Sequence, residues 1–279
     1  MMTITNEKIL TFREILLNEE KSRATIQKYV RDVTEFSIWL GEKELSKSIV
    51  LEYKEVLKEK YAITSVNSVI SSLNSFFECC SLNNLRIKTI RVQKHMFLNT
   101  EKELTKAEYE RLLRAAKKSG NERLNLVMQT ICSTGIRVSE LASITVEAVR
   151  NETALIHSKG KVRYVFLPKT LCKVLTKYAN SRKIQSGPVF VTKRGVPLNR
   201  SNIWSDMKKL CQQANVPKEK VFPHNLRHLF ARTFYSIQKD IVRLADILGH
   251  SNVNTTRIYT METGEVHRKK IQTLGLLRC

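Results

Sequence analysis

The sequence lacks features that would place it among membrane, secreted or zinc-binding proteins. No run of about 18 apolar residues occurs, so we expect no membrane-spanning helix. The N-terminus carries no basic segment followed by an apolar one, so we expect no signal peptide. None of the six cysteines belongs to a C-x-x-C pair, which argues against a metal site and favours reduced thiols in the cytoplasm.

Acidic residues are also scarce relative to basic ones. Among 279 residues, 48 Lys and Arg stand against 26 Asp and Glu, which gives a formal net charge of +22. This surplus favours a polyanionic partner, with nucleic acid first, and a basic surface that is merely soluble is the alternative. No cluster of carboxylates offers a site for a catalytic metal ion, so we expect neither a metal nor any other cofactor.

The residues best suited to chemistry gather in one stretch, residues 222–259. His224 and Arg227 are three positions apart, so on a helix they share one face. His250 follows an apolar segment that ends in glycine, a pattern typical of a helix C-terminus, and Tyr259 comes nine positions later. An arginine fork suits phosphate oxygens, imidazoles move protons near neutral pH, and a tyrosine hydroxyl can attack phosphorus. The set therefore indicates phosphoryl transfer without Mg²⁺.

Three motifs in the chain resemble those of the tyrosine recombinase, or phage integrase, family, in particular its short Xer-like members. TGIRVSELASI is similar to the family pattern T-G-x-R-x-x-E-L, and HNLRH is similar to H-x-L-R-H. LGHSNVNTTRIYT is similar to L-G-H followed nine residues on by Tyr. The resemblance covers nearly the whole chain and implies a site-specific DNA recombinase that works without metal or ATP.

The resemblance also implies a role for each matching residue. Tyr259 is expected to attack the scissile phosphate, forming a 3′-phosphotyrosyl bond and freeing a 5′-hydroxyl. Arg137 and Arg227 are expected to clamp the non-bridging oxygens, assisted by His250. Replacing either arginine with Lys should slow cleavage and change thermal stability little, since the fork acts on the phosphate. His224 is expected either to handle the tyrosine proton or to hold the phosphate.

Two more residues of these motifs are supporting candidates. Glu140 lies three positions after Arg137, on the same helical face, where its carboxylate can fix the orientation of the guanidinium. His228 closes the HNLRH motif, four positions after His224.

The segment TALIHSKGKVRYVFLP predicts a β-hairpin that turns at Lys159-Gly160-Lys161. The family carries its catalytic lysine at such a turn, in a G-K-G-x-K-x-R pattern. Lys159 is the best match and is expected to be the general acid for the leaving 5′-oxygen, while Arg163 matches the trailing arginine. Because the pattern here is one residue shorter, Lys161 is the alternative catalytic lysine.

Residues 1–84 predict a helical bundle, which the resemblance identifies as a core-binding domain that clamps DNA. Ser22 is expected to cap the second helix. Tyr29 and Trp39 lie at helical spacing, which favours a place in the core over stacking on bases. The apolar periodicity predicts helices near 5–19, 22–41, 46–60 and 63–82.

After this bundle we expect a basic linker at residues 85–103, whose charges either track a phosphate backbone or are simply solvated. The catalytic domain, residues 104–279, starts with a capping box of Thr105 and Glu108 ahead of a helix. The predicted fold is thus mainly α with a small β-sheet, an N-terminal helical bundle plus a C-terminal mixed α+β domain. Further expected elements are helices at 122–134, 138–144 and about 201–214, the hairpin, and a short strand before Gly195.

The expected partner is double-stranded DNA with paired recombination sites. A homotetramer on the DNA is expected to form from monomers, with the apolar tail LGLLRC docked on a neighbouring subunit rather than on its own. The expected location is the cytoplasm of a prokaryote, on its nucleoid. Candidate contacts to the DNA backbone are Lys88, Arg91, Lys94, Lys161, Arg163, Arg194 and Arg200.

Two other functions share parts of this pattern. A type IB topoisomerase-like enzyme would use the same chemistry and rejoin the original strand, whereas a DNA-binding regulator would have lost catalysis. Chain length and the LGH motif favour the recombinase over the first, and the complete set of arginines, His250 and Tyr259 argues against the second. The target sequence stays open, as does the choice between integration, excision and dimer resolution.

Overall fold

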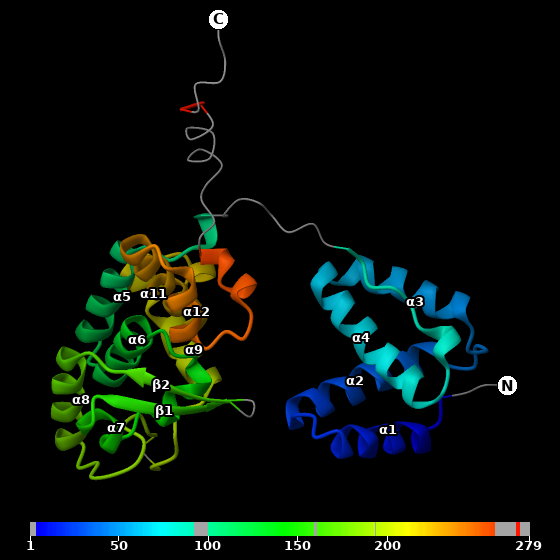
Figure 1. The fold of residues 1–279 in the computed structure, drawn as a ribbon, viewed down its shortest axis with the longest axis horizontal. Helices are drawn as coiled ribbons and strands as arrows, with labels where there is room; N and C mark the ends of the chain where they lie inside the picture. The colour runs from blue at the N-terminus through cyan, green and yellow to red at the C-terminus, as the bar shows by residue number, and fades with distance from the viewer. Residues whose placement is uncertain (1–3, 92–99, 159–160, 193, 260–271, 274–279) are drawn as a thin grey trace, which may run out of the picture. The chain divides into compact units, whose positions relative to one another are not determined.

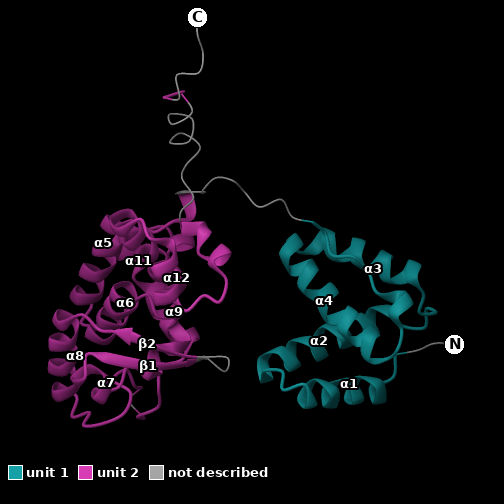
Figure 2. Ribbon diagram, viewed as in Figure 1, with its two compact units in different colours: residues 1–94 teal, residues 95–279 magenta. Residues whose placement is uncertain are grey.

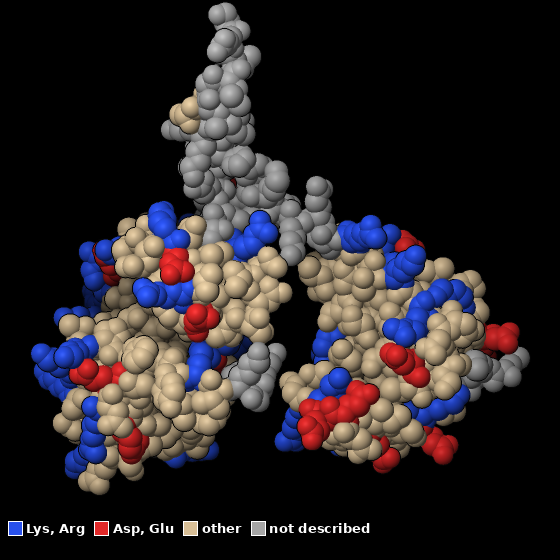
Figure 3. Space-filling model, in the orientation of Figure 1, with Lys and Arg blue, Asp and Glu red and all other residues tan. Residues whose placement is uncertain are grey.

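The chain divides into two compact units, residues 1–94 and 95–279 (Figure 2). The computed structural model confirms the predicted fold class, since both units are mainly helical and the second also holds a two-stranded sheet. Within the part of the chain that the structure describes, no helix is long and apolar enough to cross a membrane. Lys and Arg side chains are spread over the face of both units that Figure 3 shows. The described residues are 4–91, 100–158, 161–192, 194–259 and 272–273 (Figure 1).

Four helices build the first unit, each close to its predicted bounds. Side-chain caps explain where they begin: the hydroxyls of Thr5, Ser22 and Ser46 each accept a hydrogen bond from a backbone N–H of the first turn. The apolar faces of the helices close over a core that includes Phe36 and Phe76. The elements are α1 (Asn6–Asn18), α2 (Arg23–Leu40), α3 (Lys47–Lys60), α4 (Ile63–Cys79) and the 3₁₀ turn η1 (Asn83–Leu85).

The two aromatic residues singled out in the sequence pack against this core. The ring centroid of Trp39 lies 4.8 Å from that of Tyr53 and 6.2 Å from that of Phe36. Lys43 covers the same indole, with its Nζ 4.5 Å from the ring centroid. Tyr29 is partly buried against the same cluster. The prediction that these rings belong to the core is confirmed.

The chain after α4 stays packed on the first unit, although the sequence predicted a linker from residue 85. Leu85 and Ile87 are buried in its core. The amide of Asn74 bonds the N–H and the carbonyl of Ile87 at 2.9 and 2.8 Å, and Asn67 does the same for Ile90 at 2.7 and 2.8 Å. A side-chain amide both donates and accepts, so these two asparagines replace a neighbouring strand. The basic composition of the segment hid this packing.

Helix α6 (Glu122–Thr134) lies at the centre of the second unit, where α5, α8, α9 and α11 contact it. Thr105 and Glu108 form the predicted capping box ahead of α5, and Gly135 ends α6 with φ 67°. The other elements are η2 (Thr100–Lys102), α5 (Lys106–Lys118), η3 (Val138–Ser143), α7 (Val146–Arg150), α8 (Lys169–Ser181), α9 (Arg200–Lys209), α10 (Cys211–Ala214), η4 (Lys218–Lys220), α11 (Pro223–Gln238), α12 (Ile241–Leu248), η5 (Val253–Thr255) and η6 (Arg257–Tyr259).

The predicted hairpin is present as an antiparallel pair of strands, β1 (Thr153–Ser158) and β2 (Lys161–Phe166). Ser158 pairs with Lys161 in the register. The two residues that join the strands, 159 and 160, lie outside the described residues. Ala154, Ile156 and Val165 are buried on one face. The hairpin is therefore anchored by one apolar face.

Two predictions for the second unit need correction. The expected strand before Gly195 is reduced to isolated bridges, Thr145 with Pro188 and Val191 with Pro197. Proline has no N–H to donate, so a ladder cannot grow past these positions. Helix α8 was not predicted, and the expected helix at 201–214 is interrupted at one residue, Leu210.

Candidate active site

The C-terminal ends of α6 and α12 meet at Arg227 of α11. Its side chain is among the most deeply buried in the unit, at 1 % exposure. Nitrogen NH1 donates to the carbonyl of Gly135 at 2.6 Å, and NH2 donates to the carbonyl of Leu248 at 2.7 Å. Both carbonyls stand at helix C-termini, where backbone oxygens lack helical partners and carry partial negative charge. One guanidinium therefore ties two helix ends together.

His250 is held beside Arg227 by two hydrogen bonds that fix its tautomer. The Arg227 NH2 lies 3.0 Å from Nε2, and the Thr256 hydroxyl lies 2.9 Å from Nδ1. An arginine only donates, so Nε2 accepts and the ring proton sits on Nδ1, facing Thr256. Desolvation, and then the charge of Arg227 and other arginines, lowers the pKa of His250 to about 4. The ring is therefore neutral at pH 7 and orients the guanidinium.

Arg137 caps η3 and is held by Glu140, as the sequence predicted. The carboxylate accepts hydrogen bonds from the backbone N–H of Arg137 at 2.8 Å and from its NH1 at 2.9 Å. It also accepts two from Arg163 of β2, at 2.9 and 2.7 Å. Burial acts to raise the pKa of Glu140, but these donors lower it to about 2. Arg137 keeps 35 % of its side chain exposed, whereas Arg163 keeps 15 %.

Tyr259 closes η6 and is 5 % exposed. Its ring meets His228 edge to face, with 5.2 Å between centroids, and stacks on His250 at 6.4 Å. Burial raises the pKa of Tyr259, while the charge of Arg227 acts in the opposite direction. The guanidinium that is suited to phosphate thus also faces the phenol.

Two histidines lie side by side on the first turns of α11, with 4.4 Å between their ring centroids. His224 is exposed, and its pKa is lowered to about 4 by desolvation and by neighbouring positive charge, including that of Arg227. His228 faces a carboxylate instead, with 3.7 Å between Nδ1 and Oε1 of Glu103. The two rings therefore have opposite electrostatic surroundings.

The structure brings most of the predicted site residues together. Lys159 and Lys94 lie outside the described residues, as does the side chain of Lys161. Arg163, a predicted DNA contact, fastens the hairpin to η3 through Glu140. Four other predicted DNA contacts are exposed, namely Lys88, Arg91, Arg194 and Arg200. The residues gathered in one place are Arg137, Glu140, His224, Arg227, His228, His250 and Tyr259.

Sequence reasoning missed two parts of this site. Glu103 was placed in a basic linker, yet it binds His228 and Arg232 of α11. Its position two residues before the capping-box Thr105 was the available signal, because a cap fixes where the chain enters a helix. The bidentate role of Arg163 had no local signal, since its partner lies 23 positions away in the sequence.

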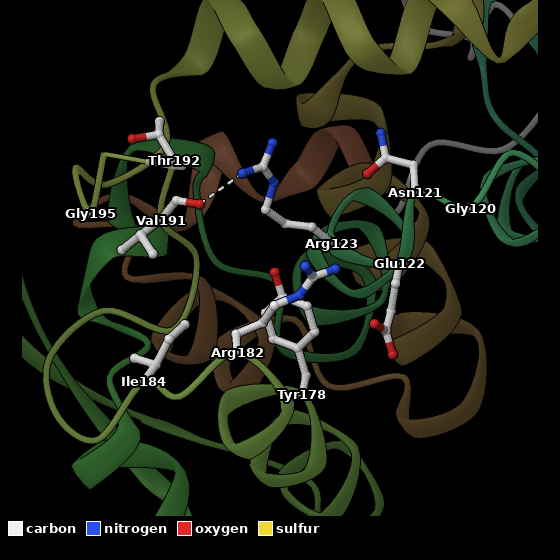
Figure 4. Close-up of a pocket in the computed structure, with 10 residues that line it drawn as sticks. All are labelled: Gly120, Asn121, Glu122, Arg123, Tyr178, Arg182, Ile184, Val191, Thr192 and Gly195. Atoms are coloured by element: carbon white, nitrogen blue, oxygen red, sulfur yellow. Dashed lines mark hydrogen bonds between the residues drawn. The ribbon is translucent and has the colours of Figure 1, made fainter.

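Elsewhere in the second unit a pocket of ≈ 510 Å³ lies at the opposite end of α6, lined by Asn121, Arg123, Tyr178 and Arg182 among others (Figure 4). Arg123 donates to the carbonyl of Val191 at 2.8 Å, which ties the loop to α6. None of the predicted site residues lines this pocket. Within the described ranges, no three His, Cys, Asp or Glu side chains form a group that suits a metal ion.

Comparison with known proteins gives the same family throughout. The phage integrase family model matches residues 102–265, and the phage integrase N-terminal SAM-like domain matches residues 9–80. Tyrosine recombinase XerA of Thermococcus kodakarensis is 32 % identical over 281 residues, covering 97 % of this chain and 96 % of its own.

Solved structures agree. The crystal structure of a XerA recombinase is 28 % identical, with a TM-score of 0.52, and covers 99 % of this chain and 100 % of its own. A lambda integrase dimer bound to a COC′ core site shares the fold, with a TM-score of 0.75 at 17 % identity, over 94 % of this chain and 97 % of its own. These matches give no support to the topoisomerase alternative, and the chain belongs to the phage integrase family of tyrosine recombinases.

Proposed function

We propose that this chain is a site-specific recombinase that cuts and rejoins double-stranded DNA through a 3′-phosphotyrosyl bond at Tyr259. The observation that carries the proposal is the position of Arg227. One buried guanidinium joins the helix ends at Gly135 and Leu248 to His250, and it also faces the phenol of Tyr259. A phosphate bound by this arginine would lie against the nucleophile.

Arg227 and Arg137 are proposed to hold the non-bridging oxygens of the scissile phosphate. Arg227 has five N–H groups and uses three on protein acceptors, and its Nε has no partner among the described residues. Arg137 is partly exposed and fixed from behind by Glu140. Preorganised donors of this kind stabilise the charge that develops on equatorial oxygens in phosphoryl transfer.

Lys159 is proposed to protonate the leaving 5′-oxygen, with Lys161 as the alternative. Arg163 supports this assignment indirectly, because it fastens the hairpin that carries both lysines to Glu140. The phosphotyrosyl bond conserves the energy of the phosphodiester, so rejoining needs no ATP. Joining to the partner duplex then gives recombination through a Holliday junction.

The two units are proposed to share the DNA. The first unit, which extends past residue 84 and includes the buried Leu85 and Ile87, would clamp the duplex, and residues 104–279 would carry the chemistry. Lys88 and Arg91 in one unit, and Arg194 and Arg200 in the other, are exposed and free to meet phosphates. Monomers are proposed to assemble as a tetramer on paired sites, bound to the nucleoid of a prokaryotic cell. Lambda integrase, a relative in fold, was crystallised as a dimer on a core site.

The proposal is tested with a nicked duplex that traps the covalent intermediate. The duplex carries the site found by footprinting DNA that flanks the coding sequence. Wild-type protein should give an SDS-stable adduct, in EDTA as well as in Mg²⁺. Tyr259→Phe should bind the same duplex and give no adduct, because only the hydroxyl is removed. Tyr235→Phe, which changes a tyrosine on α11, is the matched control and should form the adduct normally.

Three outcomes would overturn the proposal. An adduct with Tyr259→Phe would place the nucleophile elsewhere. Loss of the adduct in EDTA, restored by Mg²⁺, would point to metal-dependent cleavage. Relaxation of supercoiled DNA without any cognate site, and without strand exchange between paired sites, would favour the topoisomerase reading.

A further inference from the structure

Tyr259 also contacts a second charged group, which the proposed reaction has not used. It consists of His228 and Arg232 on α11 and Glu103 on the segment that precedes α5. The Arg232 NH1 lies 2.7 Å from Oε2 of Glu103, and the His228 Nδ1 lies 3.7 Å from Oε1. This group reaches Tyr259 through His228, whose ring centroid lies 5.2 Å from that of the tyrosine.

Hydrogen bonds from α11 to the residues on either side of Glu103 fix its position. Arg232 donates to the carbonyl of Leu104 at 2.7 Å, and Asn225 donates to the carbonyl of Lys102 at 2.9 Å. Burial acts to raise the pKa of Glu103, yet the nearby imidazole of His228 and the charge of Arg232 lower it overall. The carboxylate is therefore ionised at pH 7 and fixed against one edge of the imidazole.

The carboxylate decides which nitrogen of His228 carries the proton. An ionised carboxylate only accepts, so the neutral ring places its hydrogen on Nδ1, toward Glu103. The lone pair is then on Nε2, which is buried and has no hydrogen-bond partner among the described residues. A buried polar atom without a partner is destabilising, so an apolar ring would suit this position better if packing were the only role of His228.

His224, the other histidine beside the site, is less suited to take a proton. Burial and the neighbours His228, Arg227, Arg137 and Arg200 all oppose an imidazolium at His224. His228 has the carboxylate of Glu103 at 3.7 Å, which it shares with Arg232. The arrangement of carboxylate, imidazole and hydroxyl follows the logic of an oriented base that activates a nucleophile.

We propose that His228, oriented by Glu103, takes the proton of Tyr259 during cleavage; this assignment rests on the proposed function. The phenol O–H bond breaks and its proton passes to Nε2, while the phenolate oxygen forms the bond to phosphorus. The bond from phosphorus to the 5′-oxygen breaks, and that oxygen leaves with a proton from the hairpin lysine. In rejoining, the 5′-hydroxyl returns its proton to the hairpin lysine and its oxygen forms the bond to phosphorus. The bond from phosphorus to the Tyr259 oxygen breaks, and that oxygen regains its proton from His228. His224 is left to contact the phosphate in its neutral form.

The test compares two nicked duplexes of the same sequence in the full-length protein. One has the normal scissile phosphate, and the other carries a 5′-bridging phosphorothiolate, whose thiolate leaves without needing a proton. His228→Gln should form adduct about 10²-fold more slowly on the normal duplex, the scale of losing a general base. The phosphorothiolate should not restore the rate, because the defect lies at the nucleophile. The phosphorothiolate should, in contrast, restore the cleavage rate of Lys159→Ala, because that variant lacks only the proton donor for the leaving oxygen.

The pH profile gives a readout that a purely structural role would not move. Around His228 stand His224, Arg232, Glu103 and Tyr259, and all remain in the variant. Its cleavage rate should rise about tenfold per pH unit above pH 7, because hydroxide must then take the phenol proton. Wild-type protein should show a shallower slope. His157→Gln, an exposed histidine on β1, is the matched control and should keep the wild-type rate and slope.

Glu103→Gln provides a second test of the proposal if His228→Gln does not fold. It keeps the shape of the side chain and removes the counter-charge, so cleavage should slow and its pH slope should steepen. Glu219→Gln, an exposed glutamate, should change neither. The proposal fails if His228→Gln cleaves within about twofold of wild type, or if the phosphorothiolate restores it, or if Glu103→Gln keeps the wild-type slope. Absence of any adduct with wild-type protein would instead overturn the proposed function itself.

Discussion

The two arginines of the site are held in opposite ways. Arg137 is partly exposed and bound by the carboxylate of Glu140, which it shares with Arg163. Arg227 is buried and bound only by neutral acceptors, two helix-terminal carbonyls and the ring of His250. The first arginine therefore has a counter-charge in the protein, and the second has none beside it except the dipoles of two helix ends.

This difference separates two tasks. A guanidinium without a carboxylate partner keeps its charge for the phosphate, and burial strengthens that attraction because little solvent screens it. The same burial makes Arg227 part of the fold, since it joins α6, α11 and α12. Arg137 can be lost with less structural damage, but its orientation depends on a network that reaches the lysine-bearing hairpin through Arg163.

Replacing each arginine with Lys should show the difference between the two most clearly. Arg227→Lys is expected to lower the cleavage rate by about 10³-fold and Arg137→Lys by about 10²-fold, the range for losing one preorganised donor. The sequence-based expectation of little change in stability is corrected for Arg227, because its guanidinium bonds two helix-end carbonyls that a single ammonium cannot both reach. Only Arg227→Lys should therefore also lower the melting temperature. Suicide-duplex cleavage and thermal melts on both variants measure this. Equal melting temperatures for the two would show that Arg227 acts on the phosphate alone.

Glu140→Gln tests how far Arg137 depends on the carboxylate that holds it. It leaves the guanidiniums of Arg137 and Arg163 without their counter-charge. Breaking a buried ion pair typically costs about 3–5 kcal/mol of unfolding free energy. Cleavage should fall by at least about tenfold, since Arg137 loses its fixed orientation. Denaturant unfolding and adduct formation measure both effects. Glu110→Gln, an exposed glutamate on α5, should leave both unchanged; a matching loss there would point to a general effect of charge.

Gly249→Ala tests the link between the two arginine networks. A Cβ at this position would stand 2.7 Å from Cδ of Arg163, and φ is +64°. Since the far end of Arg163 is held by Glu140, its side chain must shift and should disturb Arg137, slowing cleavage a few-fold. Gly120→Ala has a similar φ of +69° with nothing within 4 Å, so it carries only the backbone strain. Equal cleavage rates for the two alanine variants would show that Arg163 adapts freely.

The smallest expected effect is a dependence of stability on pH. The pKa of His250 is about 4 in the folded chain against 6.5 in the unfolded one, so unfolded protein binds more protons between these values. Stability should therefore be complete above pH 6.5 and fall as the pH drops toward 4. Thermal melts at pH 7 and pH 5 should show a smaller fall for His250→Asn than for wild type. An identical fall in both would remove His250 from this dependence, and His157→Gln serves as the control.

The sequence was most informative where function requires a fixed local spacing. The distance from His250 to Tyr259, the Arg137–Glu140 pair and the helix that ends at Gly249 were all predicted and are present. It was uninformative where the relation depends on tertiary packing. The burial of Arg227 against two helix ends has no local pattern, and a lone arginine in a basic chain gives no sign that it stabilises the fold.

The same limit applies to the carboxylates and to the hairpin. Glu103 stood in a segment that composition assigned to a linker, because nothing in the linear sequence pairs it with His228, 125 positions on. The pairing of Arg163 with Glu140 was not predicted for the same reason. Helix α8 (Lys169–Ser181) was not predicted, although its buried residues Leu171, Leu175 and Tyr178 recur at helical spacing.

The central claim, that Tyr259 attacks the phosphate held by Arg227, is tested most directly by mapping the covalent adduct. Adduct formed on the nicked duplex is digested with nuclease and trypsin, and the modified peptide is sequenced by mass spectrometry. The account predicts one modified peptide, IYTMETGEVHR, residues 258–268, with the nucleotide on Tyr259. A nucleotide on any other tyrosine, or on a serine, would contradict it.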